Sequence, residues 1–182
     1  MPIGRFKIYA HRGAMFTSPE NTLEALRRAQ AEGADGIEFD VQLSVDGELF
    51  LFHDDSALRV CGRDLPVGDL KWRELKELKV FGRHTIPHLD DVLAAMEGWR
   101  GGEIFLDLHQ PRVALAEAVA RKLADSPARA RAYILDFYKS RRLLMAAKKA
   151  APSVRLAAMP GPPWHTRASC NLGVSAISLG WD

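Results

Sequence analysis

The sequence predicts a parallel α/β fold, in which β-strands alternate along the chain with amphipathic helices. Two observations support this prediction. Short runs rich in β-branched and aromatic residues alternate with stretches whose apolar residues recur at helical spacing. In addition, polar clusters containing histidine or carboxylate side chains stand where four of the predicted strands end. Both features are typical of a barrel whose parallel strands bring their carboxyl ends to one functional face.

The N-terminal part of the chain is predicted to be a strand–helix–strand unit. Phe6–Ala10 is the expected first strand. Asn21 or Thr22 can cap the helix that follows, and Gly33 stops it. The second strand is expected over Gly36–Val41.

A third strand is expected over Glu48–Phe52, with Asp46 and Gly47 supplying the turn before it. Only a few residues separate this strand from the second, too few for a crossover helix. If the two strands are parallel, Gln42–Val45 must run back as extended chain. That would be a departure from an ideal barrel.

The rest of the chain continues the alternation after a weaker region at residues 54–87. The elements expected there are a short helix at Trp72–Leu78, a helix at Leu89–Met96, a strand at Ile104–Leu108, a helix at Arg112–Ala124, a strand at Ala132–Leu135, a helix at Ser140–Ala150, a strand at Val154–Ala158, a loop at Pro160–Pro163 and a strand at Val174–Leu179. Because no linker or internal repeat divides the chain, we expect residues 1–182 to form a single domain.

Composition narrows the class of protein. The chain is 47% hydrophobic, and its net charge of +2 is too small to indicate nucleic-acid binding. No apolar run approaches the roughly 18 residues that a membrane span needs, and the N-terminus has no apolar signal region. Cys61 and Cys170 match no metal-ligand spacing. We therefore expect a cytoplasmic protein with reduced thiols.

The candidate chemistry lies in four polar clusters at predicted strand ends: His11-Arg12-Gly13, Glu38-Phe39-Asp40, His53-Asp54 and Asp107-Leu108-His109. Because side chains alternate along a strand, Glu38 and Asp40 project to one side, as do Asp107 and His109. Three converging carboxylates without cysteine suit a hard divalent cation, Mg²⁺ or Ca²⁺. Two histidines beside it suit general acid–base chemistry.

Other polar residues have simpler interpretations. His84, His88 and His165 lie in predicted loops, and we expect them to be structural. Asp54 can be a ligand, or it can cap the loop after its strand.

Six sequence motifs follow one another in a distinctive order: A-H-R-G (Ala10–Gly13), P-E-N-T (Pro19–Thr22), G-A-D-G-I-E-F-D-V (Gly33–Val41), F-H-D (Phe52–Asp54), D-L-K-W-R-E-L-K-E-L (Asp69–Leu78) and I-P-H-L-D-D-V-L (Ile86–Leu93). In order and spacing they resemble the glycerophosphodiester phosphodiesterase family. The resemblance is specific over roughly residues 8–95 and looser beyond them.

This resemblance implies a TIM-type (β/α) barrel that hydrolyses small glycerophosphodiesters to glycerol 3-phosphate and an alcohol. Position by position, it makes His11 and His53 the catalytic histidines. It makes Glu38 and Asp40 metal ligands, and it makes Arg12 the arginine that faces the substrate phosphate.

The fourth strand departs from the family pattern. The family usually has Glu-x-Lys there, with the Glu on the metal and the Lys on the phosphate, whereas this chain has Asp107-Leu108-His109. The resemblance therefore makes Asp107 the third metal ligand and His109 the phosphate-binding residue. Aspartate is a shorter ligand, and histidine carries a full charge only when protonated. We expect the substrate choice or the pH dependence to differ accordingly.

Length is the second departure. A TIM barrel usually needs about 250 residues, and this chain has 182. We therefore expect a TIM-type barrel that is incomplete at its C-terminal end and lacks its last strands. Open sheet edges tend to pair with another chain, so self-association through these edges is also expected.

Two alternatives to glycerophosphodiester hydrolysis stay open at this point. One is a related lipid phosphodiesterase of the sphingomyelinase D or phospholipase C type, which would prefer long-chain phospholipids. The other is a truncated, non-catalytic barrel that binds phosphodiesters without turning them over.

Overall fold

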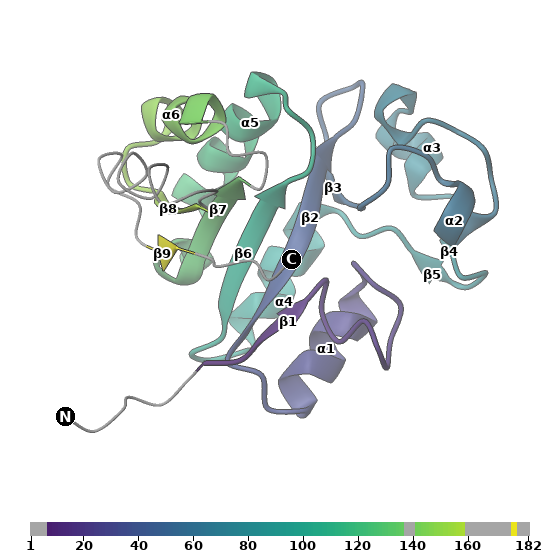
Figure 1. Cartoon of the computed structure of the whole chain (residues 1–182), viewed down its shortest axis with the longest axis horizontal. Coiled ribbons are helices and arrows are strands. Elements are labelled where there is room, and N and C mark those ends of the chain that lie inside the picture. Colours follow the sequence, from purple (N-terminus) through teal and green to yellow (C-terminus); the bar gives the residue numbers. More distant parts are fainter. Residues whose placement is uncertain (1–6, 137–140, 159–175, 178–182) are drawn as a thin grey trace.

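The computed structural model describes residues 7–136, 141–158 and 176–177. Within them, a seven-stranded sheet has the order β1-β2-β6-β7-β8-β9, and β3 pairs with β2 (Figure 1). The strands are β1 (Tyr9–His11), β2 (Gly36–Leu43), β3 (Leu49–Leu51), β6 (Glu103–Leu108), β7 (Ala132–Asp136), β8 (Arg155–Ala158) and β9 (Ala176–Ile177). Every pairing along the main path is parallel. The predicted parallel α/β class is therefore confirmed.

The longer helices are α1 (Leu23–Ala31), α4 (Leu89–Glu97), α5 (Val113–Ala124) and α6 (Arg141–Ala150). In Figure 1, α4, α5 and α6 lie against one face of the sheet, and α1 lies beside β1 and β2. None of the helices in the described part of the chain is long and apolar enough to cross a lipid bilayer.

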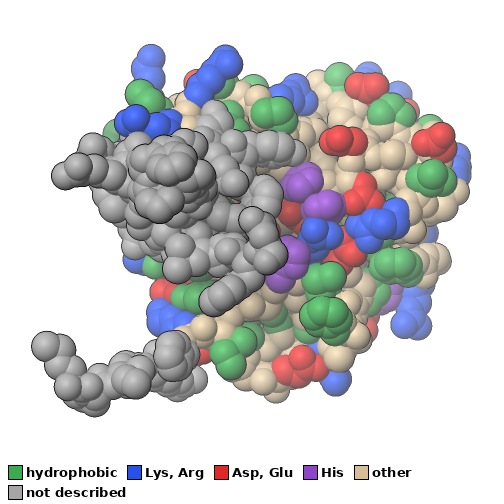
Figure 2. Space-filling model, in the orientation of Figure 1, with side chains coloured by type: hydrophobic (Ala, Val, Ile, Leu, Met, Phe, Trp, Pro, Cys, Tyr) green, Lys and Arg blue, Asp and Glu red, His purple; other side chains and the backbone are tan. Residues whose placement is uncertain are grey.

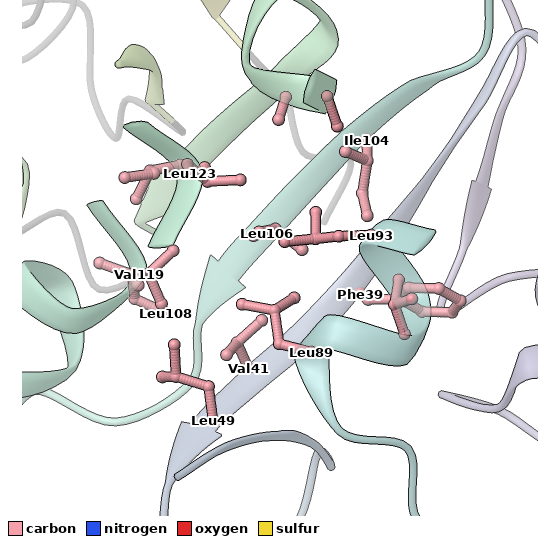
Figure 3. Close-up of a cluster of buried hydrophobic side chains, with 14 of the residues drawn as sticks. Phe39, Val41, Leu49, Leu89, Leu93, Ile104, Leu106, Leu108, Val119 and Leu123 are labelled. Carbon is pink, nitrogen blue, oxygen red and sulfur yellow. The ribbon is translucent and has the colours of Figure 1, made fainter. Parts of the chain in front are cut away.

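Side chains along each strand point alternately to the two faces of the sheet, and those on one face form the core with the helices. Phe39, Val41, Leu106 and Leu108 are fully buried on the helix-covered face, where they meet residues such as Leu89 (Figure 3). Side chains of the intervening positions point the other way, because neighbouring residues of a strand face opposite sides. The helices thus bury one face of the sheet and leave the other to carry polar groups.

The helix boundaries follow from local chemistry. The Thr22 side chain accepts a hydrogen bond from the Ala25 backbone N–H and so caps α1. At the other end, Gly33 takes a positive φ of 83°, a conformation that glycine adopts without strain. Of the two caps considered for this helix, the structure selects Thr22.

The third predicted strand forms a hairpin with the second rather than a barrel strand. β2 continues to Leu43, and β3 pairs with it antiparallel, with Leu43 opposite Leu49. Gly47, at φ 90°, lies in the tight turn between them. The short connection explains this result, because a hairpin needs only a turn whereas a parallel pair needs a crossover.

The region at residues 54–87 contains more structure than predicted. It holds the helices α2 (Leu58–Cys61) and α3 (Trp72–Leu75), the 3₁₀ turn Val67–Asp69, and a hairpin of β4 (Lys79–Val80) and β5 (His84–Thr85). These elements form a cluster at one side of the sheet (Figure 1) with a small core of its own, which includes Phe50, Phe52 and Leu75. The expected helix at Trp72–Leu78 ends at Leu75.

The first strand is shifted from the prediction: β1 covers Tyr9–His11 instead of Phe6–Ala10, and Phe6 lies outside the described residues. β6, α5 and β7 match the expected segments to within one residue at each end. Ser140, the loop at Pro160–Pro163 and most of the strand predicted over Val174–Leu179 lie outside the described residues, within which the last strand is represented by β9.

The described sheet does not close on itself. Its path ends at β1 on one side and at β9 on the other. A parallel sheet with helices on its outer face and two unjoined ends is an incomplete TIM-type barrel, as expected.

We predict that Leu106→Ala lowers the free energy of unfolding by about 2–5 kcal/mol, because it leaves a cavity in the core between sheet and helices. Chemical denaturation measures this change. Met145→Ala, on the 55% exposed Met145 side chain of α6, is the control and should cost less than about 1 kcal/mol. Equal losses in the two variants would contradict the location of this core.

Candidate active site

Strand register brings the predicted carboxylates together. Asp40 of β2 lies opposite Asp107 of β6, and His11 of β1 lies opposite Glu38 of β2. Glu38 and Asp40 alternate along β2 with the helix-facing Phe39 and Val41, so they point to the face that the helices leave uncovered. Asp107 does the same between Leu106 and Leu108 of β6. Parallel pairing at this register therefore gathers residues from three separate stretches of sequence.

The loop after β1 is fixed by its backbone. Arg12 and Gly13 have positive φ values of 53° and 76°. A Cβ atom on Gly13 would lie 2.6 Å from the Cβ of Ala25, so only glycine lets the loop pack this closely against α1. In this position the Arg12 backbone N–H donates a hydrogen bond to Glu38 Oε2 over 3.0 Å.

Asp40 is the most enclosed of the site carboxylates, with 2% of its surface exposed. Asn21 contacts it twice: the amide donates to Asp40 Oδ2 at 2.8 Å, and the amide oxygen accepts from the Asp40 backbone N–H at 3.1 Å. Arg12 Nε lies 3.3 Å from Oδ2, and His109 Nδ1 lies 3.3 Å from Oδ1. These groups offset the cost of burying the charge.

The crowding of carboxylates perturbs their protonation. Burial raises the pKa of the Glu38 carboxyl well above its usual range, and the neighbouring charges of Asp40 and Asp107 raise it further. Burial also acts to raise the pKa of Asp40, but hydrogen bonds from His109 and Asn21 outweigh it, so the pKa is lowered.

The negative charge of the site carboxylates also changes the pKa of His109. Burial alone would lower the pKa of its imidazole, but Asp107 and Asp40 outweigh burial and raise the pKa to about 9. At neutral pH and without a bound cation, His109 is therefore protonated. In that state it supplies a positive charge to the two aspartates.

His53 belongs to a second network around the end of β3. Its Nδ1 lies 2.6 Å from Asp54 Oδ1. The guanidinium of Arg59 donates to both oxygens of Asp54, at 2.6 and 2.9 Å, and to both oxygens of Glu20, at 2.8 and 2.7 Å. Glu20 also accepts from Arg12 Nη1 at 3.0 Å. The sequence predicts that Asp54 is either a ligand or a loop cap, whereas its side chain contacts His53 and Arg59 in the structure.

Sequence reasoning missed Arg59 and Gln42. The Gln42 amide donates to the backbone carbonyls of Phe52, His53 and Asp54 at 3.0–3.2 Å and so holds the segment that carries His53. Strand periodicity could have identified Gln42, which lies two residues after Asp40 and therefore on the same side. Arg59 gave no comparable signal, because α2 was not predicted.

All seven residues singled out from the sequence lie at one site. The rings of His53 and His109 are 4.2 Å apart between centroids, and His11 Nε2 lies 3.7 Å from Glu38 Oε2. Figure 2 shows histidine, acidic and basic side chains gathered in a patch on one face of the molecule. His84 and His88 instead pair with Glu24 and Glu48. They do not lie in loops as predicted, because His84 belongs to β5 and His88 caps α4, and His165 lies outside the described residues.

Glu38, Asp40 and Asp107 form a group that fits a divalent cation. One carboxylate oxygen from each lies within 4.8 Å of the others. Oxygen donors alone suit hard ions such as Mg²⁺ and Ca²⁺. Burial raises the pKa of Glu38, and the crowded negative charge of Asp40 and Asp107 raises it further; a cation would relieve that crowding.

Fold and site together define a TIM-type barrel protein whose polar residues converge at the carboxyl ends of the strands. Residues 11–157 match the glycerophosphoryl diester phosphodiesterase family. The chain belongs to this family.

Individual relatives agree with this assignment. A glycerophosphodiester phosphodiesterase from Bacillus altitudinis is 43% identical over 94 residues, which cover 48% of this chain and 38% of that enzyme. The matched region therefore spans well under half the length of this relative.

Solved structures share the fold. A glycerophosphodiester phosphodiesterase from Thermotoga maritima superposes with a TM-score of 0.77 at 23% identity, covering 96% of this chain and 74% of that one. A phosphodiesterase from Oleispira antarctica, solved with the product sn-glycerol-3-phosphate, has a TM-score of 0.78 at 25% identity, covering 94% and 73%.

We predict that Asn21→Gly lowers the free energy of unfolding by about 2–3 kcal/mol, because it removes both contacts to the buried Asp40. Glycine tolerates the positive φ of 53° at this position, so the loss reports on the hydrogen bonds. Asn21→Ala should lose a further 1–2 kcal/mol or so through the left-handed backbone. Wild-type stability of Asn21→Gly in urea denaturation would contradict this account of Asp40.

Proposed function

We propose that this chain carries the site for metal-dependent hydrolysis of glycerophosphodiesters to glycerol 3-phosphate and an alcohol. The observation that carries the proposal is the convergence of Glu38, Asp40 and Asp107 with His11 and His53 at one edge of the sheet. Family membership and the product complex of the Oleispira antarctica relative support the same substrate class.

Glu38, Asp40 and Asp107 are the proposed ligands of the cation, Mg²⁺ or Ca²⁺. When bound, the cation would supply Lewis-acid stabilisation of the negative charge on the phosphoryl oxygens. The protein positions these ligands through other side chains. Asn21 holds Asp40 from one side, and the Arg12 backbone N–H holds Glu38.

Arg12 and His109 are the proposed phosphate-binding residues. The contacts of Arg12 with Glu20 and Asp40 use its Nη1 and Nε atoms, which fix the plane of the guanidinium. A fixed guanidinium suits the oxygens of a phosphate group. His109, beside Asp40 and Asp107, would donate a hydrogen bond to the phosphate and adds a positive charge when its imidazole is protonated.

His11 and His53 are the proposed acid–base pair. Asp54 accepts from His53 Nδ1, which orients the imidazole and leaves Nε2 for proton transfer. His11 is 62% exposed at the end of β1, where a substrate can reach it. One histidine takes the proton of the attacking oxygen, from water or a glycerol hydroxyl, and the other protonates the leaving alcohol.

One observation favours a second candidate function. The described sheet ends at β1 and β9 without joining, so a non-catalytic barrel that binds phosphodiesters is the rival.

The single domain, self-association through the open edges and the cytoplasmic location remain predictions. A lipid phosphodiesterase of the sphingomyelinase D or phospholipase C type would be indicated by a preference for long-chain phospholipids.

We predict that the chain releases glycerol 3-phosphate from glycerophosphocholine in the presence of Mg²⁺ or Ca²⁺, and that EDTA abolishes the release. An enzyme-coupled assay of glycerol 3-phosphate measures it. Release that persists in EDTA would contradict the metal requirement. Binding of glycerophosphocholine without release, by a folded chain in either metal, would support the non-catalytic rival.

We predict that His11→Gln and His53→Gln each lower the rate of that hydrolysis by about 10²–10⁴-fold, because each removes one partner in proton transfer. His84→Gln, which removes a histidine paired with Glu24 outside the site, is the matched control and should keep the wild-type rate. Unchanged turnover in both site variants would overturn the acid–base assignment.

A further inference from the structure

We propose that Asp40, His53 and His109 form a second cation site, suited to a transition-metal ion such as Zn²⁺. One donor atom from each of these residues lies within 4.8 Å of the others. The set shares Asp40 with the three-carboxylate group but replaces the other two oxygen donors by imidazole nitrogens. Its chemistry is therefore different from that of the proposed Mg²⁺ or Ca²⁺ site.

The spacing of the donors agrees with a small tetrahedral ion. Zn²⁺ binds nitrogen and oxygen at about 2.0–2.1 Å, so two donors at a tetrahedral angle lie about 3.3 Å apart. His109 Nδ1 and Asp40 Oδ1 are 3.3 Å apart, and a bound ion would displace the proton from Nδ1 and release it to solvent. The His53 ring is next to that of His109, with centroids 4.2 Å apart. Three protein donors leave one coordination position for water or another ligand.

The surroundings of His53 are those of a metal-binding histidine. A carboxylate on one ring nitrogen fixes the orientation of the ring and increases the basicity of the other nitrogen. Asp54 is in this position, 2.6 Å from Nδ1, and Arg59 holds both Asp54 oxygens. Nε2 is then the donor that His53 presents.

The two cation groups select different ions and compete. Imidazole favours Zn²⁺ and neighbouring transition metals, whereas carboxylate oxygens favour Mg²⁺ and Ca²⁺. Because both groups use Asp40, an ion in one group competes for a carboxylate that the other group also needs. A transition metal on His53 also occupies the nitrogen assigned to proton transfer. If the proposed function holds, on which this consequence rests, Zn²⁺ therefore inhibits hydrolysis by at least tenfold when it saturates the site.

Co²⁺ serves as the probe, because four-coordinate Co²⁺ with nitrogen ligands absorbs visible light far more strongly than Co²⁺ among six oxygens. We predict that titrating the full chain with Co²⁺ produces this strong band with one ion per chain, and that Zn²⁺ displaces it. His53→Gln and His109→Lys should lose the band, whereas the control His84→Gln should keep it. Asp54→Asn should weaken Co²⁺ binding by about 10–100-fold. Circular dichroism verifies that each variant is folded.

The outcomes separate this site from the proposed function. A wild-type chain without the strong band, or a band that survives in both His53→Gln and His109→Lys, would overturn the second cation site. The titration uses no substrate, so hydrolysis with no band refutes only this inference. An intact band in a chain that does not hydrolyse glycerophosphocholine refutes only the proposed function.

Discussion

Three carboxylates share one buried corner of the sheet, and the rest of the site is arranged around the need to offset their charge. Glu38, Asp40 and Asp107 meet because β2 and β6 are parallel and in register. In a poorly solvated position, like charges at this spacing cannot all ionise without compensation. The raised pKa of Glu38 and the raised pKa of His109 are two responses to that single constraint.

Side chains outside the sheet offset part of this negative charge, so the loops that carry them contribute to the candidate site. Arg12 reaches Asp40 from the loop after β1, and Asn21 reaches it from the residues before α1. Arg59 in α2 joins Glu20 to Asp54 and thereby links this loop to His53. The small cluster at residues 54–87 thus contributes to the candidate site, because its helix α2 supplies the guanidinium that holds the carboxylate next to His53.

His109 stands where the family pattern has lysine, and the two side chains differ in how they can offset the negative charge of the aspartates. A lysine would carry its charge permanently and offers no lone pair while protonated. Histidine can be a cation beside Asp40 and Asp107 or, once neutral, a nitrogen ligand next to His53. The same side chain therefore belongs to both the proposed phosphate-binding group and the proposed second cation site.

Much of the fold and the composition of the site could be predicted from local sequence. The spacing of apolar residues located β6, α5 and β7 almost to the residue, because amphipathic periodicity is a property of each segment alone. The hairpin at Lys79–Thr85 could not be found in this way, since its two-residue strands are stabilised by packing onto Phe50, Phe52 and Leu75.

The sequence by itself determined the family to which the chain belongs and indicated the candidate site residues, because motif residues stand at strand ends that a parallel sheet must bring to one face. Only the tertiary structure decided the direction of β3, the role of Arg59 and the contacts of His109. These depend on distances between segments far apart in the chain, such as Asp40 and His109, and the pairing register rather than any local pattern sets such distances.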